Sequence, residues 1–437
     1  MSEKQVISDA FLQITDFSWL ETAYRHARKQ KRYRNEFLAF ANNLDDNLHS
    51  IQDRVRDGSF VFGPYRKHWV YVPKKRLVMA LPCDSRIVQW AIYDLLNPFY
   101  DRMMIEDSYA CRKGKGSLAA VKRLQYWMKQ VEGKPGQWYC LKLDISKYFY
   151  RVDHAVLLQI LGERIKDPRL MELLDKIINC DGERFGLPRF MGPDDAEEAD
   201  WLADVGMPIG NLTSQLFANI YLDQLDQFCK HVLHIHYYIR YMDDVIILAE
   251  TKEQAHTYRL AIEAFLKTML RLDLNRKTAI FPAKRIEFVG YMVTSHELKL
   301  RKATVRRIKE AMRAISRKLF TGEMTKQDFD RRVASYKGMI QHCTNAGLRD
   351  RLNEIYLHAK ERYGGNNQMG TMSHLQIIQA MSEIIEKQNA IIRAQADSLQ
   401  QLGAVCMEEE TRQVNQECHR LLGIGEAPDE FDGEEGT

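Results

Sequence analysis

The chain has 437 residues, 45% hydrophobic and 28% charged, so it is long enough for more than one structural unit around a large core. It lacks an apolar run of the roughly 18 to 20 residues that span a membrane, and charges throughout its first thirty residues argue against a signal peptide. With eight scattered cysteines and no CxxC pair, we expect a cytoplasmic protein without a membrane partner, disulfides or a zinc site.

The formal net charge of +4 is distributed unevenly along the chain. Residues 367–437 contain 4 Lys and Arg against 13 Asp and Glu, a charge of −9, which leaves +13 for residues 1–366. A large basic body favours a polyanionic partner, nucleic acid first, because neutralising phosphates releases counterions.

The first predicted elements are basic. Residues 20–56 have helical spacing, with many Arg and Lys side chains between positions 25 and 34. Over residues 69–81, apolar residues surround Pro73 and a cluster of basic residues, which predicts a basic hairpin. An amphipathic helix is expected over residues 86–100.

The middle of the chain places carboxylates at the ends of strands. The strand pattern 138–143 ends in Asp144, and a helix is expected from Asp153. After a turn-rich stretch, residues 212–228 have helical spacing. Strand-like runs at 236–241 and 245–248 are separated only by Met242, Asp243 and Asp244, which predicts a hairpin with carboxylates at its tip.

The remaining elements are mostly helical. We expect a helix over 255–271, a single strand over 286–293 that crosses Gly290, and basic helices over 302–363. Beyond a Gly-rich linker, apolar residues between 378 and 406 recur at 3/4 spacing, which is typical of a coiled coil or helical hairpin. The last twelve residues carry six acids and are expected to be disordered.

The carboxylates of the hairpin suggest a metal site. An isolated Asp-Asp pair is more often a turn than a metal site. Here the flanking strands are apolar, and a divalent cation would offset the repulsion between Asp243 and Asp244. With Asp144 as a third ligand, such a site would hold two Mg²⁺ about 3.5 to 4 Å apart, with Mn²⁺ as a substitute. One ion would activate a primer 3′-hydroxyl, and the other would neutralise a triphosphate.

Several motifs resemble those of reverse transcriptases, in the expected order along residues 15–360. YMDD at 241–244, LDISKYF at 143–149 and GMPIGNLTSQLFANIYL at 206–222 are similar to palm motifs of this family. The segments 73–101 and 108–116 resemble its fingers motifs, and LNRKTAI at 274–280 with EFVGY at 287–291 resembles the motifs that follow the catalytic hairpin. The resemblance implies RNA-templated DNA synthesis.

The resemblance also implies roles for single residues. The implied metal ligands are Asp144, Asp243, Asp244 and the backbone carbonyl of Ile145. Lys277, or Arg276 beside it, matches the lysine that protonates the pyrophosphate leaving group. Phe149 occupies the sugar-gate position, where a bulky ring collides with a ribose 2′-hydroxyl; a core aromatic would also fit there.

Further contacts are expected with the incoming nucleotide and the nucleic acid. The implied nucleotide-binding residues are Arg76, Arg86, Lys75, Phe149, Ile209, Gly210, Ser214, Gln215, Tyr241 and Met242. Among these, the arginines suit a triphosphate because a guanidinium presents a fork of donors. The residues expected on the nucleic-acid backbone are Arg112, Lys113, Lys115, Arg306, Arg307 and Arg313.

Within this superfamily the segment IGNLTSQ at 209–215 discriminates between subtypes. Retroviral, retron and group II intron enzymes usually have QGxxxSP there, whereas this chain has Ile209 and Gln215 at the outer positions. The pattern is similar to reverse transcriptases of diversity-generating retroelements, as are residues 23–34 and 108–116. The two changes are also compatible with a conventional group II-like enzyme, and a catalytically idle RNA-binding scaffold is the alternative outside enzymes.

The resemblance implies an α+β right-hand polymerase fold with partners to match. The expected domains are a basic helical segment (1–60), fingers with the start of the palm (61–143), catalytic palm (144–298), helical thumb (299–363), linker and coiled-coil-like appendage (364–425) and acidic tail (426–437). Expected partners are a template-repeat RNA, the RNA–DNA hybrid formed with the cDNA, and deoxynucleoside triphosphates. A helical accessory variability protein, or self-association through residues 370–422, would engage the appendage.

Overall fold

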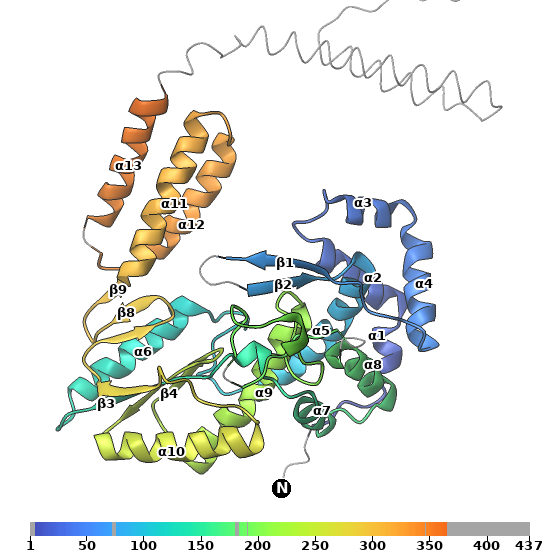
Figure 1. Cartoon of the computed structure of the whole chain (residues 1–437), viewed down its shortest axis with the longest axis horizontal. Coiled ribbons are helices and arrows are strands. Elements are labelled where there is room, and N and C mark those ends of the chain that lie inside the picture. The colour runs from blue at the N-terminus through green and yellow to red at the C-terminus, as the bar shows by residue number, and fades with distance from the viewer. Residues whose placement is uncertain (1–4, 72–75, 180–182, 190, 346, 365–437) are drawn as a thin grey trace, which may run out of the picture. The chain divides into compact units, whose positions relative to one another are not determined.

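A computed structural model describes residues 5–71, 76–179, 183–189, 191–345 and 347–364 (Figure 1). The chain divides into two compact units, Met1–Met312 with Asp330–Asn353, and Arg313–Phe329 with Glu354–Thr437. Within the described ranges, no helix has the length and apolar character needed to cross a membrane. The predicted appendage beyond residue 364 and the nucleotide-binding candidate Lys75 lie outside the described residues.

The amino-terminal region is helical, as the spacing over residues 20–56 predicts. Its helices are α1 (Phe11–Ile14), α2 (Phe17–Arg28), α3 (Asn35–Asn42) and α4 (Leu44–Arg56). Asp16 caps α2, because its carboxylate accepts hydrogen bonds from the backbone N–H groups of Ser18 and Trp19. The helical prediction is therefore confirmed, with a break between residues 28 and 35.

The predicted basic hairpin and the helix after it are present. Strands β1 (Arg66–Val70) and β2 (Arg76–Ala80) pair antiparallel, with Trp69 opposite Leu77. Helix α5 (Cys83–Met103) follows and packs against α2. The next helix, α6 (Ser117–Glu132), was not predicted from the sequence.

A four-stranded antiparallel sheet forms the centre of the first unit. Its strands are β3 (Tyr139–Asp144), β4 (Tyr238–Tyr241), β5 (Asp244–Ala249) and β6 (Ala279–Pro282), in the order β4-β5-β3-β6. The inner strands β3 and β5 are almost entirely apolar up to their carboxylate ends, and helix α10 (Lys252–Met269) packs against both. The carboxylates thus lie at the end of a buried part of the sheet.

Helix α9 (Leu212–Gln227) is the most deeply buried helix to carry a predicted motif, and it packs against α5 (Figure 1). It continues into a π-helical turn, Phe228–Val232. Helices α7 (His154–Gly162) and α8 (Pro168–Asn179) precede it. The predicted cap of α7 is confirmed, since the Val156 N–H donates to Asp153 Oδ1 at 3.0 Å.

The prediction of one strand over residues 286–293 is wrong. This segment forms two short antiparallel strands, β7 (Ile286–Phe288) and β8 (Tyr291–Val293), and β9 (Leu298–Leu300) completes a small sheet. The chain reverses at Val289 and Gly290, whose φ angles are +40° and +88°. Glycine adopts such a conformation without a steric penalty, which permits a tight turn inside an apolar run.

The predicted helical region after residue 301 consists of α11 (Lys302–Phe320), α12 (Lys326–Gln341) and α13 (Leu348–Tyr363). In the first unit, the Thr344 N–H donates to the Leu298 carbonyl, which joins the end of α12 to β9. In the second unit, the ring of Tyr356 lies 5.4 Å from Phe320 and 5.5 Å from Phe329. The described chain therefore has the mixed helical and antiparallel architecture expected from its sequence.

Candidate active site

The three predicted carboxylates lie at one edge of the central sheet. Asp144 ends β3 and Asp244 begins β5, and the two residues are register partners across the ladder. Asp243 occupies the turn between β4 and β5, directly before Asp244. The Asn275 N–H donates to the Asp144 carbonyl at 2.7 Å, which fixes the backbone at the end of β3.

Asp243 is in an environment that disfavours its charge. Burial raises the pKa of its carboxyl to about 6, and the negative charges of Asp244 and Asp144 act in the same direction. The positive charge of Arg76 opposes this shift. The three carboxylates are therefore close enough to repel one another, and Arg76 is the cation that partly offsets this repulsion.

The carboxylates do not form a ready-made metal cage. Among the described residues, no group of three or more His, Cys, Asp or Glu side chains converges closely enough to hold an ion. Lys142 Nζ lies 3.9 Å from Asp244 Oδ1 and donates to the Glu287 carbonyl at 2.9 Å. The donor set of hard oxygens still suits Mg²⁺ or Mn²⁺, since a cation would relieve the repulsion at Asp243.

The two predicted triphosphate arginines differ in their surroundings. Arg76 begins β2 and is exposed, and its charge acts on Asp243. Arg86, on α5, instead donates to Glu36 Oε1 at 2.7 Å, and both side chains are largely buried. Arg66 also approaches Glu36, at 3.9 Å. The expected role of Arg86 at the triphosphate thus competes with an internal ion pair.

The loop before α9 is joined to the fingers-like hairpin. The Met79 N–H donates to the Ile209 carbonyl at 2.8 Å. Gly210 has a φ of +127°, and a Cβ atom there would lie 2.5 Å from the Met79 carbonyl oxygen. Asn211 Nδ2 donates to the Tyr65 hydroxyl at 2.8 Å. Only glycine permits this close approach of the two backbones.

Gln215 on α9 meets a residue that the sequence analysis overlooked. The thiol of Cys111 donates to Gln215 Oε1 at 3.4 Å, and both residues are exposed. Cys111 also lies near Tyr241, whose pKa is raised by burial and by the thiol. Ser214, the neighbouring candidate, is buried. Cys111 lies within the segment 108–116, so its motif was recognised although its contact was not.

Phe149 lies on the short 3₁₀ turn Tyr148–Tyr150, a few residues after Asp144. Its ring is half-buried and lies edge-on to Tyr148, with the centroids 5.6 Å apart. The Met207 N–H donates to the Phe149 carbonyl at 2.7 Å, which joins this turn to the loop that leads into α9. The backbone at the predicted sugar gate is therefore tied to this loop.

The basic candidates divide into internal and exposed groups. Arg112 was expected on the nucleic-acid backbone, but its side chain is only 7% exposed and pairs with Asp101 at 2.5 Å. Lys115 is also largely buried and pairs with Glu106. The candidates that face solvent are Lys113, Lys277, Arg306, Arg307 and Arg313.

A buried ion pair beneath the hairpin was not predicted from the sequence either. Arg240, the residue directly before Tyr241, pairs with Asp226 of α9, and both side chains are fully buried. A charged residue inside an otherwise apolar strand was the available signal.

Comparison with known proteins identifies the family. Residues 66–293 match the family described as "Reverse transcriptase (RNA-dependent DNA polymerase)". The chain belongs to this family. The matched residues include all three carboxylates of the sheet edge, and this reverse transcriptase is accordingly an RNA-directed DNA polymerase. Enzymes of this family generally use divalent metal ions.

Several curated proteins are similar to this reverse transcriptase. Protein YkfC of Escherichia coli is 26% identical over 54% of this chain and 67% of its own length. The group II intron-encoded protein LtrA of Lactococcus lactis is 24% identical over 42% of the chain and 28% of its own length. The putative COX1/OXI3 intron 2 protein of Saccharomyces cerevisiae is 26% identical over 42% of the chain and 20% of its own length.

Among solved structures, telomerase from Candida albicans aligns with 77% of this chain and 61% of its own, at 11% identity and a TM-score of 0.41. Telomerase from Candida tropicalis aligns with 57% of this chain at a TM-score of 0.39.

Proposed function

We propose that this reverse transcriptase extends a primer with deoxynucleotides on an RNA template at the sheet edge formed by Asp144, Asp243 and Asp244. The observation that supports this most strongly is the register pairing of Asp144 with Asp244, with Asp243 in the adjoining turn. Three hard carboxylates that repel one another at the end of a buried sheet suit divalent cations better than any structural role.

The proposed mechanism assigns each group a task. When bound, two divalent ions supply activation of the primer 3′-hydroxyl and neutralisation of the leaving pyrophosphate. Asp144, Asp243 and Asp244 hold them, with the Ile145 carbonyl assisting. Arg76 contacts the incoming triphosphate, because it is exposed and its charge already acts on Asp243.

Other residues select and complete the reaction. Phe149 excludes a ribose 2′-hydroxyl by contact, and Lys277, which is exposed, donates a proton to the leaving pyrophosphate. Ile209, Gly210, Ser214 and Gln215 border the templating pair. Lys113, Arg306, Arg307 and Arg313 contact the phosphate backbone, since all four are exposed.

We further propose that the enzyme belongs to a diversity-generating retroelement and copies template adenines with errors. The motif IGNLTSQ supports this assignment. The similarity to LtrA supports the alternative, a conventional group II-like reverse transcriptase. Under the first assignment, a helical accessory protein or a second copy of the chain binds residues 370–422.

The experiment is primer extension by the full chain on matched RNA and DNA templates with Mg²⁺ or Mn²⁺. We expect deoxynucleotide incorporation on RNA, and loss of incorporation when a chelator is added. Binding of the primer–template without any incorporation would instead support an RNA-binding scaffold. Sequencing of the cDNA then separates the two subtypes, since only the first predicts errors confined to template adenines.

A further inference from the structure

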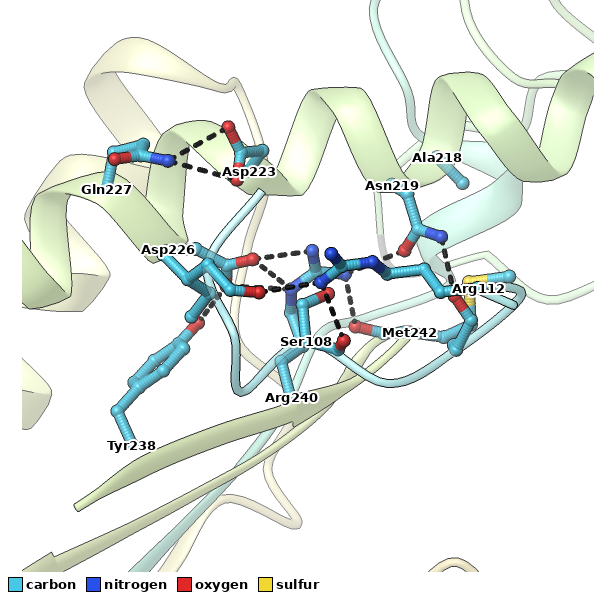
Figure 2. A network of polar contacts seen from close by, with 12 residues as sticks. Ser108, Arg112, Ala218, Asn219, Asp223, Asp226, Gln227, Tyr238, Arg240 and Met242 are labelled. Carbon is cyan, nitrogen blue, oxygen red and sulfur yellow. Dashed lines mark hydrogen bonds and ion pairs between the residues drawn. The ribbon is translucent and has the colours of Figure 1, made fainter. Parts of the chain in front are cut away.

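Arg240 and Asp226 form a completely buried ion pair beneath the catalytic hairpin (Figure 2). Arg240 Nη2 lies 2.6 Å from Asp226 Oδ2, and Nε donates to both carboxylate oxygens, at 2.8 and 3.0 Å. The Tyr238 hydroxyl adds a third donor to Asp226 Oδ1 at 2.5 Å. This two-pronged contact fixes the plane of the guanidinium relative to α9.

The free edge of the same guanidinium points to the hairpin turn. Arg240 Nη1 donates to the carbonyl of Met242 at 3.3 Å and to Asn219 Oδ1 at 3.2 Å. Asn219 is itself fixed, because its Nδ2 donates to the Ala110 carbonyl at 2.8 Å. A chain of contacts, buried except at its partly buried end on Met242, therefore runs from the body of α9 to the peptide bond between Met242 and Asp243 (Figure 2).

The turn needs such support. Met242 has a φ of +54°, a left-handed conformation that is unfavourable for a residue with a side chain. The Met242 carbonyl belongs to the peptide that leads into Asp243, so its orientation helps to set the direction in which Asp243 leaves the turn. A donor fixed on that carbonyl favours one orientation of the turn over others.

Stability alone does not account for the ion pair. Removing two charges from water costs free energy that their attraction often fails to recover, and apolar residues of similar volume are frequently as stable. The backbone of Arg240 is also held independently, since its N–H donates to the Asp107 carbonyl and its carbonyl accepts from the Tyr109 N–H, both at 3.0 Å. The side chain is therefore not needed to keep β4 in place.

We propose that Arg240, oriented by Asp226, is a positioning residue that holds the Met242 carbonyl and thereby aims the Asp243 and Asp244 carboxylates for metal binding. This inference rests on the proposed function of the carboxylate edge. In this role the ion pair acts through the Met242 carbonyl and not through direct contact with substrate. Loss of the pair should weaken metal binding, because groups that orient metal ligands typically contribute about 10- to 100-fold to affinity or activity.

Two variants test the inference. Arg240→Lys keeps the charge but loses the fork of donors. The triple variant Tyr238→Phe, Asp226→Leu, Arg240→Met replaces the ion pair by apolar groups, so it preserves packing without the contact to Met242. The matched control is Tyr221→Phe, which removes a buried hydrogen bond of 2.7 Å from the same helix to the Leu270 carbonyl and leaves the hydrogen bonds of Arg240 in place.

The decisive readout is Mn²⁺ binding, measured by electron paramagnetic resonance on the complex with primer–template, a dideoxy-terminated primer and the next deoxynucleotide. Circular dichroism shows which variants are folded. We expect folded Arg240 variants to bind Mn²⁺ more than about threefold more weakly. Their kcat should fall by a larger factor than the factor by which their KM for deoxynucleotide changes. Tyr221→Phe should lower the melting temperature and leave Mn²⁺ binding unchanged.

A folded Arg240 variant that binds Mn²⁺ within about threefold of the wild type overturns the inference. Asp243→Asn, measured alongside, separates this failure from failure of the proposed function. If Asp243→Asn abolishes Mn²⁺ binding while the Arg240 variants keep it, only the positioning role is wrong. If Asp243→Asn also keeps Mn²⁺ binding and extension, the proposed active site is wrong.

Discussion

Asp144 and Asp244 are direct partners across the β3–β5 ladder, although they are 100 positions apart in the chain. Like charges directly opposite each other destabilise a sheet. Asp243 adds a third carboxylate whose pKa burial and these two neighbours raise to about 6. The fold thus places an unfavourable concentration of negative charge at the end of its most apolar strands, which is the arrangement a cation-dependent polymerase requires.

Phe149→Ala tests the sugar gate. Removal of the ring opens space beside the turn that follows Asp144, so we expect ribonucleotide incorporation to rise by roughly tenfold or more relative to deoxynucleotide incorporation. Single-nucleotide extension with matched ribo- and deoxynucleotides measures this ratio. Phe149→Tyr keeps the ring and should keep the ratio. An unchanged ratio in the alanine variant would place the gate elsewhere.

Ile209→Gln tests the diversity-generating assignment. Glutamine would restore a side chain that can hydrogen-bond near the incoming nucleotide, and one such bond is worth roughly 0.5 to 1.5 kcal/mol, or up to about tenfold in discrimination. We expect wild-type errors to concentrate at template adenines and the variant to make fewer of them. Sequencing cDNA from a defined RNA measures both. Uniformly low wild-type error at all four bases would contradict this subtype.

Gly210→Ala tests the contact between the loop before α9 and the hairpin. The new Cβ would lie 2.5 Å from the Met79 carbonyl oxygen, so the loop and β2, the strand that Arg76 begins, must separate. We expect the KM for deoxynucleotide to rise several-fold. Gly136→Ala is the control, because Gly136 also has a positive φ, +88°, but nothing within 4 Å of its Cβ position. Equal effects of both variants would mean that backbone strain alone matters.

Asp223→Asn tests the pH dependence of stability. Burial, followed by the charge of Asp226, raises the pKa of Asp223 to about 7, although Arg240 opposes the shift. The native carboxyl therefore keeps a proton that the unfolded chain releases near pH 4, so the wild type loses stability as the pH rises from about 4 to about 7. The stability of the asparagine variant relative to the wild type should therefore be higher at pH 8 than at pH 5.

Urea denaturation at both pH values measures the difference. Since one pKa unit corresponds to about 1.4 kcal/mol, we expect the stability of the variant relative to the wild type to rise by roughly 2 kcal/mol between pH 5 and pH 8, after allowance for solvent screening. A variant less stable than the wild type at pH 8 would show that the Asp223 charge contributes favourably to the native state.

Local patterns predicted much of this fold. The hairpin at 236–248 and the helix that starts after Asp153 follow from alternation and capping, which depend only on neighbouring residues. The turn at Val289 and Gly290 was missed because an apolar run on both sides resembles one strand. Such a reversal depends on backbone angles that a pattern of apolar residues does not encode.

The carboxylates of the site were identifiable, but their supporting contacts were not. Arg112 and Arg86 lie in basic motifs, yet each pairs with an acid, Asp101 or Glu36, that the motif does not contain. The partner of Arg240 likewise lies 14 positions away on another element. Tertiary partners of charged residues cannot be read from spacing, so the sequence overstates how many of these basic side chains face solvent.

The central claim is tested most directly by extension of an annealed primer on RNA by Asp243→Asn. Asparagine preserves size and removes one negative ligand, so the account predicts a loss of Mg²⁺-dependent extension of roughly a hundredfold or more, with primer–template affinity unchanged. Extension at the wild-type rate by this folded variant would contradict the assignment of the active site to the β3–β5 edge.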